Sequence, residues 1–167
     1  TMVLTPRIVE SVKIPVVTVG GIADGRSLAA ALILGAQGVM MASRFVATKE
    51  CEVHENVKQE LLRRQEHETV IFGKSIGLQG RALKNRVLEE VLAIEARGGG
   101  LEELIPLLAG PRIREAWEKG DVDYAPLMVG QSIGLIRDIP TCRELIERMA
   151  AEAGEHLKRA CRLTGSI

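Results

Sequence analysis

The residues best suited to bind a ligand are small ones that end two apolar stretches of the chain. Gly20 and Gly21 follow the β-branched stretch 16–19, and Ala42 and Ser43 end a second apolar stretch further along. Glycine leaves no Cβ between its backbone N–H and a ligand, and serine adds a hydroxyl. These residue types predict an anion site built from backbone donors, of the kind that binds phosphate.

Such a site forms only if the two apolar stretches are neighbouring strands. The stretches 16–19 and 38–42 carry no charge, which is typical of parallel strands buried on both faces. Segment 26–34 between them is rich in helix formers, and 6–12 has helical spacing, so the order predicts a helix followed by a β-α-β unit. The small residues would then share one sheet edge, where the free N–H groups and dipole of the helix after Gly21 also favour an anion.

The rest of the chain is predicted to be mainly helical. Two strong strands cannot close a parallel sheet, so we expect most of the sheet to lie outside this sequence. Gly98–Gly100 is predicted as a flexible break rather than a phosphate loop, because no strand precedes it. The other expected elements are helices at 50–68, 81–96, 101–108, 111–119 and 141–163, one short strand and a loop within 69–80, an irregular stretch at 121–129, and a loop or helix start at 130–134.

Composition argues against several classes of partner. The 22 basic residues balance the 22 acidic ones, so no general field attracts nucleic acid or an anionic membrane. The apolar stretch 28–42 is interrupted by glycines and is too short to span a bilayer. Cys51, Cys142 and Cys161 lack metal-like spacing, which predicts reduced thiols, no metal site and a cytoplasmic protein.

Four segments resemble a known family. The sequences GGIADGR (20–26) and GAQGVMMASRF (35–45) are similar to the FMN phosphate-binding region of nitronate monooxygenases, formerly called 2-nitropropane dioxygenases. GRALKN (80–85) resembles a segment of that family's small helical domain, and VGQSIGLI (129–136) resembles a segment near its flavin. The segments occur in the family's order and cover nearly the whole chain. The FMN-dependent enoyl-acyl-carrier-protein reductases share this architecture.

The resemblance implies FMN as cofactor and assigns residues to it. Gly20, Gly21, Ala42 and Ser43 would hold the phosphate. Gln131 and Ser132 would lie near the isoalloxazine ring, where hydrogen bonds tune the flavin. The family usually has Gly-Thr where this chain has Ala42 and Ser43. Serine keeps the hydroxyl, while the methyl group of Ala42 narrows the space through which the phosphate approaches the backbone. The implied cofactor-binding residues are Gly20, Gly21, Ala42, Ser43, Gln131 and Ser132.

The fold implied by the resemblance is α/β: a partial (β/α)8 TIM barrel containing the last two strands, with an inserted, mainly helical small domain. The C-terminal barrel strands with the phosphate site would occupy 1–48. The inserted, helical substrate-side domain would occupy 49–124, and the closing loop and last helix of the barrel 125–167. The family's catalytic histidine belongs to a loop that this chain lacks, so no catalytic residue is assigned here. We expect a small-molecule substrate, and either a homo-oligomer or the missing N-terminal part of the same barrel as partner.

The implied reaction is oxidation of an alkyl nitronate to a carbonyl compound and nitrite, with oxygen reoxidising FMN. Three alternatives stay open. An enoyl-acyl-carrier-protein reductase would use NAD(P)H to reduce a double bond. The IMP dehydrogenase group shares a Gly-Gly-Ile loop but needs a catalytic cysteine in a loop, whereas Cys51 is predicted in a charged helix. A non-catalytic fragment or FMN-binding subunit would hold the cofactor without turnover.

Overall fold

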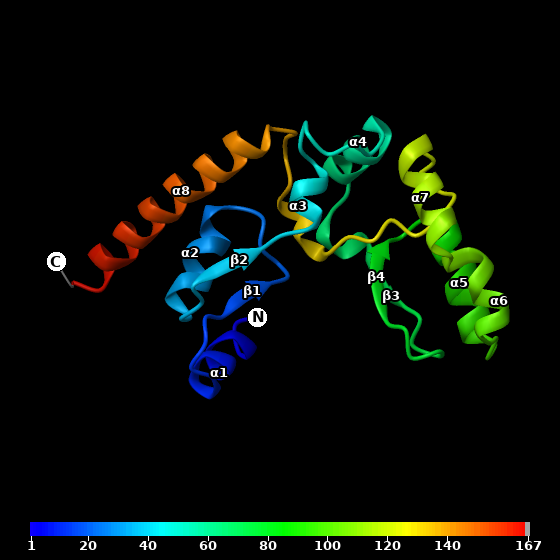
Figure 1. The fold of residues 1–167 in the computed structure, drawn as a ribbon, viewed down its shortest axis with the longest axis horizontal. Coiled ribbons are helices and arrows are strands. Elements are labelled where there is room, and N and C mark those ends of the chain that lie inside the picture. Colours follow the sequence, from blue (N-terminus) through cyan, green and yellow to red (C-terminus); the bar gives the residue numbers. More distant parts are fainter. Residues whose placement is uncertain (166–167) are drawn as a thin grey trace.

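The computed structural model describes residues 1–165 and has a mixed helix and strand fold. Figure 1 shows an arch: β1, β2, α1, α2 and α8 form one arm, the β3–β4 hairpin and α5–α7 form the other, and α3 and α4 lie between them. In chain order the elements are α1 (Leu4–Ser11), β1 (Val17–Val19), α2 (Gly25–Ile33), β2 (Gly38–Met40), α3 (Ser43–Val46), α4 (Glu55–Arg63), η1 (Glu66–Glu68), β3 (Thr69–Phe72), β4 (Gly80–Leu83), α5 (Arg86–Ala96), α6 (Leu101–Leu108), α7 (Gly110–Lys119), η2 (Gln131–Leu135) and α8 (Cys142–Leu163).

The predicted β-α-β unit is confirmed. β1 pairs with β2 in parallel, with Val17 opposite Gly38 and Val19 opposite Met40. The amphipathic helix α8 packs along α2, and the two helices share a small buried core. Because both strands run the same way, the residues that follow them meet at one edge of the sheet. The buried core residues of this arm are Ile22, Ala31, Ala36, Leu145 and Met149.

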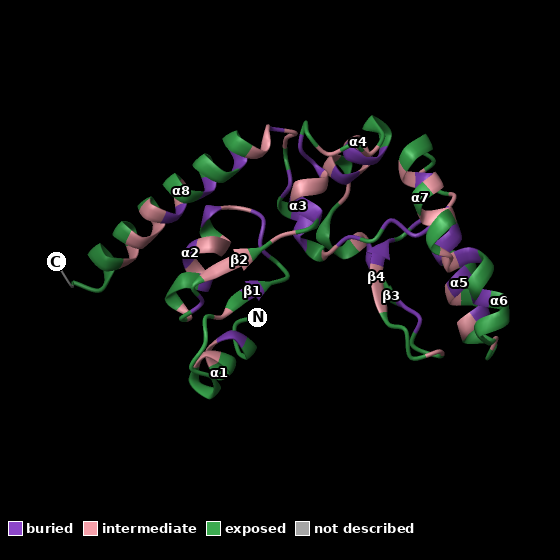
Figure 2. Ribbon diagram, in the orientation of Figure 1, coloured by how far each residue is buried: buried purple, intermediate pink, exposed green. Residues whose placement is uncertain are grey.

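The prediction that the first strand is buried on both faces is wrong for this structure. Only Thr18 of β1 is buried, and its hydroxyl lies 3.2 Å from that of Thr5 on α1. Val17 and Val19 point to the opposite face and are 57% and 56% exposed. In Figure 2 the exposed and half-buried colours accordingly dominate β1 and β2. Successive side chains of a strand face opposite sides, and nothing in the described chain covers the second side.

Gly25 provides a test of the packing between α2 and α8. A Cβ added to Gly25 would lie 2.2 Å from Cβ of Glu152 and 2.7 Å from N of Ala153, so Gly25→Ala forces the helices apart. We expect a loss of about 1–3 kcal/mol in the free energy of unfolding, measured by urea denaturation. Gly154→Ala is the matched control, because nothing lies within 4 Å of an added Cβ there. This variant should gain up to about 1 kcal/mol, and equal stability of the two variants would contradict the packing.

The second arm differs from the prediction in one element. Segment 81–96 was predicted as one helix, but its first residues form β4, which pairs antiparallel with β3 from Thr69–Leu83 to Phe72–Gly80. The helix α5 begins only at Arg86, after Asn85 caps it by accepting from the Leu88 N–H at 3.0 Å. Arg, Ala and Leu favour helices locally, and pairing with β3 outweighs that preference. The predicted break at 98–100 and the two short helices after it are confirmed.

Two apolar clusters hold the centre and the second arm together. The central one joins α3 and α4 to η2 and the strand-like stretch before it, and the other joins the hairpin to α5 and α6. The central cluster therefore fixes η2, which carries Gln131 and Ser132, against the segment that follows β2. Within residues 1–165, no helix is both long enough and apolar enough to cross a membrane.

Candidate functional site

The glycines after β1 form an open loop at the carboxyl end of the parallel pair. Gly20 and Gly21 have φ angles of +92° and +80°, in the left-handed region that favours glycine. A Cβ added to either would meet nothing within 4 Å, so the space beside this backbone is free. Ala42 and Ser43 follow β2 at the same end, because Val19 and Met40 are paired. The structure thus brings together the four residues predicted to hold a phosphate.

Ser43 links the end of β2 to the segment after Val129. Its Oγ accepts a hydrogen bond from the Gly130 N–H at 2.9 Å. A Cβ added to Gly130 would lie 3.9 Å from Oγ of Ser43 and 3.8 Å from Oγ of Ser132, so the two hydroxyls flank the same glycine. Ser43 and Ser132 are both buried, whereas Gln131 is exposed. Two distant motifs of the sequence therefore meet at Gly130, and the binding roles predicted for them remain predictions.

The N-terminus of α2 does not offer the free donors expected from the sequence. Asp24 caps the helix, and its Oδ1 accepts from the Ser27 N–H at 3.0 Å. The Gly25 N–H donates to Oε2 of Glu152 on α8, also at 3.0 Å. Burial by itself would raise the pKa of Asp24, but bonds from Ser27 and Arg26 outweigh it and lower the pKa. Protein carboxylates therefore already bind two N–H groups of this helix end.

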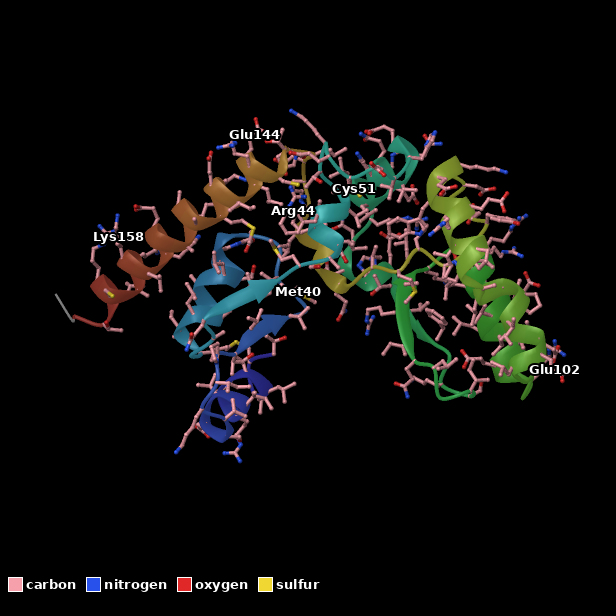
Figure 3. The ribbon with its side chains drawn as sticks, viewed as in Figure 1. Met40, Arg44, Cys51, Glu102, Glu144 and Lys158 are labelled. Carbon is pink, nitrogen blue, oxygen red and sulfur yellow. The ribbon has the colours of Figure 1, made fainter. Side chains whose placement is uncertain are left out.

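Arg44 forms an ion pair with Asp138. The Arg44 side chain is only 2% exposed, and its Nη2 lies 2.8 Å from Oδ1 of Asp138. Burial lowers the pKa of Arg44, while the nearby Asp138 carboxylate opposes that shift. Arg148 on α8 binds the same carboxylate, with Nη1 2.5 Å from Oδ2. Figure 3 shows Arg44 beside α3, on the side toward the start of α8.

A polar cavity lies behind these contacts. Its volume is about 470 Å³, and its walls come from the start of α2, the segment 135–138 and one face of α8. Arg44, Asp138, Arg148 and Glu152 all line it. The charged groups that connect α8 to the start of α2 and to the segment 135–138 therefore surround one solvent-accessible space.

The pKa of Asp138 gives a pH prediction. The hydrogen bond from Arg148 lowers this pKa below its ordinary value of 3.8, with Arg44 contributing in the same direction. Because the pKa is lower in the folded chain than in the unfolded one, the ion pairs stabilise fully above pH 3.8 and lose that effect as the pH falls through the lowered pKa. Solvent screens the half-exposed carboxylate, so we expect a modest effect.

Asp138→Asn should remove this pH dependence. Its free energy of unfolding, measured in urea between about pH 5 and pH 3, should fall less steeply with acidity than that of the parent protein. Parallel curves for the two proteins would contradict the assignment.

The histidines lie outside the predicted site. His54 caps α4, its Nδ1 accepting from the Asn56 N–H at 3.1 Å, and His67 is an exposed residue of η1. His156 is a half-buried residue of α8. Cys51, Cys142 and Cys161 are free thiols, as predicted. Of the three histidines, His156 lines the cavity that Arg44 and Asp138 also line.

The fold and the site define a class: a mixed α/β protein with a small-residue loop and a serine at the ends of adjacent parallel strands. The family model described as nitronate monooxygenase matches residues 1–152. The chain belongs to the nitronate monooxygenase family, as its motifs predicted.

Individual relatives agree with this assignment. The chain is 32% identical to the (3aS,4S,5R,7aS)-5-hydroxy-7a-methyl-1-oxo-octahydro-1H-indene-4-carboxyl-CoA dehydrogenase of Rhodococcus jostii, over 92% of this chain and 54% of that protein. It resembles the structure of FabK from Thermotoga maritima with a TM-score of 0.91 and 36% identity, over all of this chain and 52% of the other. Nitroalkane oxidase from Streptomyces ansochromogenes gives a TM-score of 0.78 and 28% identity, over 95% and 45%. The chain thus spans about half the length of these relatives.

Proposed function

We propose that this chain carries the FMN phosphate site and part of the flavin pocket of an oxidoreductase that oxidises alkyl nitronates to carbonyl compounds and nitrite with oxygen. The observation that carries the proposal is the open Gly20–Gly21 backbone beside Ser43 at the ends of two parallel strands. Membership of the nitronate monooxygenase family supports the choice of reaction.

The residues present fit a phosphate monoester. The space beside the Gly20 and Gly21 backbone is open, so a phosphate could approach and accept hydrogen bonds from the N–H groups there. The Gly130 N–H already occupies one lone pair of Ser43 Oγ, so the hydroxyl proton of Ser43 is available to donate to the phosphate. When bound, FMN supplies the redox chemistry, and this chain supplies orientation and hydrogen bonds to it.

The surrounding fold is proposed to be the last part of a (β/α)8 barrel. In this proposal β1 and β2 are its final strands, 49–124 is the inserted domain and 125–167 closes the barrel. The uncovered valines of β1 and the half-length match to the relatives support this arrangement. The partner of β1 and β2 would be the remaining strands of the same barrel, and that part would also carry the catalytic base.

An enoyl-acyl-carrier-protein reductase is the second candidate function. The TM-score of 0.91 and the 36% identity to FabK favour it specifically, because both values exceed those for the nitroalkane oxidase. The two functions would share the phosphate site described above. They differ in the compound that reduces the flavin, which is the nitronate in the first function and NAD(P)H in the second. The experiment below uses this difference.

The test begins with the flavin absorption spectrum of the full gene product titrated with FMN under anaerobic conditions. The nitronate of 2-nitropropane should bleach the flavin bands, and admitting oxygen should restore them and release nitrite. Bleaching by NAD(P)H with recovery on adding an enoyl thioester would support the reductase instead. A protein that does not bind FMN would overturn both candidates.

A further inference from the structure

One face of the long helix α8 is linked indirectly to both parts of the proposed phosphate site, the loop of Gly20 and Gly21 and the start of α3 at Ser43. Arg148 and Glu152 are four residues apart, so their side chains lie next to each other on the helix surface. Arg148 binds the carboxylate of Asp138 through Nη1 at 2.5 Å and Nη2 at 3.1 Å. Glu152 accepts from the Gly25 N–H at 3.0 Å. Each of these partners belongs to a short path that leads to one of the two loops.

The path from Arg148 leads to Ser43. Asp138, held by Arg148, accepts from Nη2 of Arg44 at 2.8 Å, and its main-chain carbonyl accepts from Nη1 at 3.1 Å. These bonds commit the buried Arg44 guanidinium to Asp138, so it is not directed at a ligand. Arg44 directly follows Ser43 in α3. Fixing Arg44 therefore fixes the backbone on which the Ser43 hydroxyl is carried.

The path from Glu152 leads to the glycine loop. Gly25 ends the loop that Gly20 and Gly21 begin, and glycines lose more conformational freedom on ordering than other residues. Such a loop stays in one conformation only if its far end is held. The bond to Glu152 holds Gly25, and Ile22 in the middle of the loop packs in the same core cluster as Leu145 and Met149 of α8.

We propose that α8 sets the distance between the two phosphate loops through Arg148 and Glu152, which act as positioning residues without touching the phosphate. The inference rests on the proposed FMN site and assigns a role in it to a helix that lies outside the site itself. Arg44, Asp138, Arg148 and Glu152 line one cavity, so both paths run along its walls.

The test compares two double variants of the full gene product. Arg148→Ala with Glu152→Ala removes both anchors while keeping helix-favouring residues in α8. The matched control, Arg143→Ala with Glu147→Ala, removes an exposed ion pair of 3.7 Å with the same spacing in the same helix. For each protein the dissociation constants of FMN and of riboflavin are measured by flavin fluorescence. Riboflavin is FMN without its phosphate, so it reports binding that does not involve the two loops.

The anchor variant should bind FMN about tenfold more weakly while its riboflavin affinity changes by less than about twofold, and the control should change neither. Equal weakening of both ligands, or unchanged FMN affinity, would overturn the positioning role. If the double variant does not yield folded protein, Arg148→Ala alone is judged by the same ratio. A parent protein that binds FMN no more tightly than riboflavin would instead overturn the proposed phosphate site.

Discussion

Replacing Gly20 and Gly21 together with alanine is expected to weaken FMN binding by at least about tenfold, or about 1.4 kcal/mol. Two effects act in the same direction. The new methyl groups enter the open space beside this backbone. Alanine at φ angles of +92° and +80° also costs roughly 1–2 kcal/mol per residue. The loop would relieve that strain by turning its N–H groups away from the ligand. The measurement is an FMN titration followed by flavin fluorescence.

Gly77→Ala separates the loss of a binding loop from general backbone strain. Gly77 lies in the turn of the β3–β4 hairpin, has φ of +71°, and has nothing within 4 Å of an added Cβ. Its substitution therefore imposes the same kind of strain in a part of the fold away from the site. We expect its FMN affinity to stay within about twofold of that of the parent protein. Equal losses in the two variants would show that the Gly20–Gly21 loop has no particular role in binding.

The sequence was sufficient to predict the parts of this site that depend on local residue types. The uncharged β-branched run before Gly20, the helix formers after Asp24 and the second apolar run each determine one element, and their order implies parallel pairing. Each of these features depends on neighbours within a few residues.

The features that the sequence did not reveal depend on contacts between distant segments. β4 was missed because Gly80–Leu83 has no strand signal of its own and becomes a strand by pairing with β3. The occupation of the α2 N-terminus by Glu152 joins residues 127 positions apart, and the Arg44–Asp138 pair joins residues 94 apart. The four-residue spacing of Arg148 and Glu152 on an amphipathic helix was the only available signal for their shared role, and it does not identify a partner.

The exposure of β1 also could not be predicted from local residue types, because it depends on contacts with other segments. A strand with three β-branched residues is suited to burial on both faces, but burial needs a second layer. In the described chain α1 covers Thr18, whereas Val17 and Val19 face no other element. The pattern of residue types is therefore consistent with a second layer that packs on the face of Val17 and Val19.

Ile133→Ala is expected to lower the free energy of unfolding by about 2–5 kcal/mol, the usual cost of deleting a large side chain from a packed core. Ile133 is fully buried in η2, within a cluster that includes Val57 and Leu61 of α4. Because η2 also carries Ser132, the cavity left by this substitution should loosen the segment that meets Ser43. Urea denaturation followed by the fluorescence of Trp117, which packs against the same cluster, measures the loss.

Leu135→Ala is the matched control for that substitution. It removes a side chain of similar size two residues further along the same segment, but Leu135 is 42% exposed. Little packing is lost there, so we expect a decrease of less than about 1 kcal/mol. The difference between the two variants isolates the contribution of the core beneath η2. If Leu135→Ala proved as costly as Ile133→Ala, the central cluster would not be what holds Ser132 beside Gly130 and Ser43.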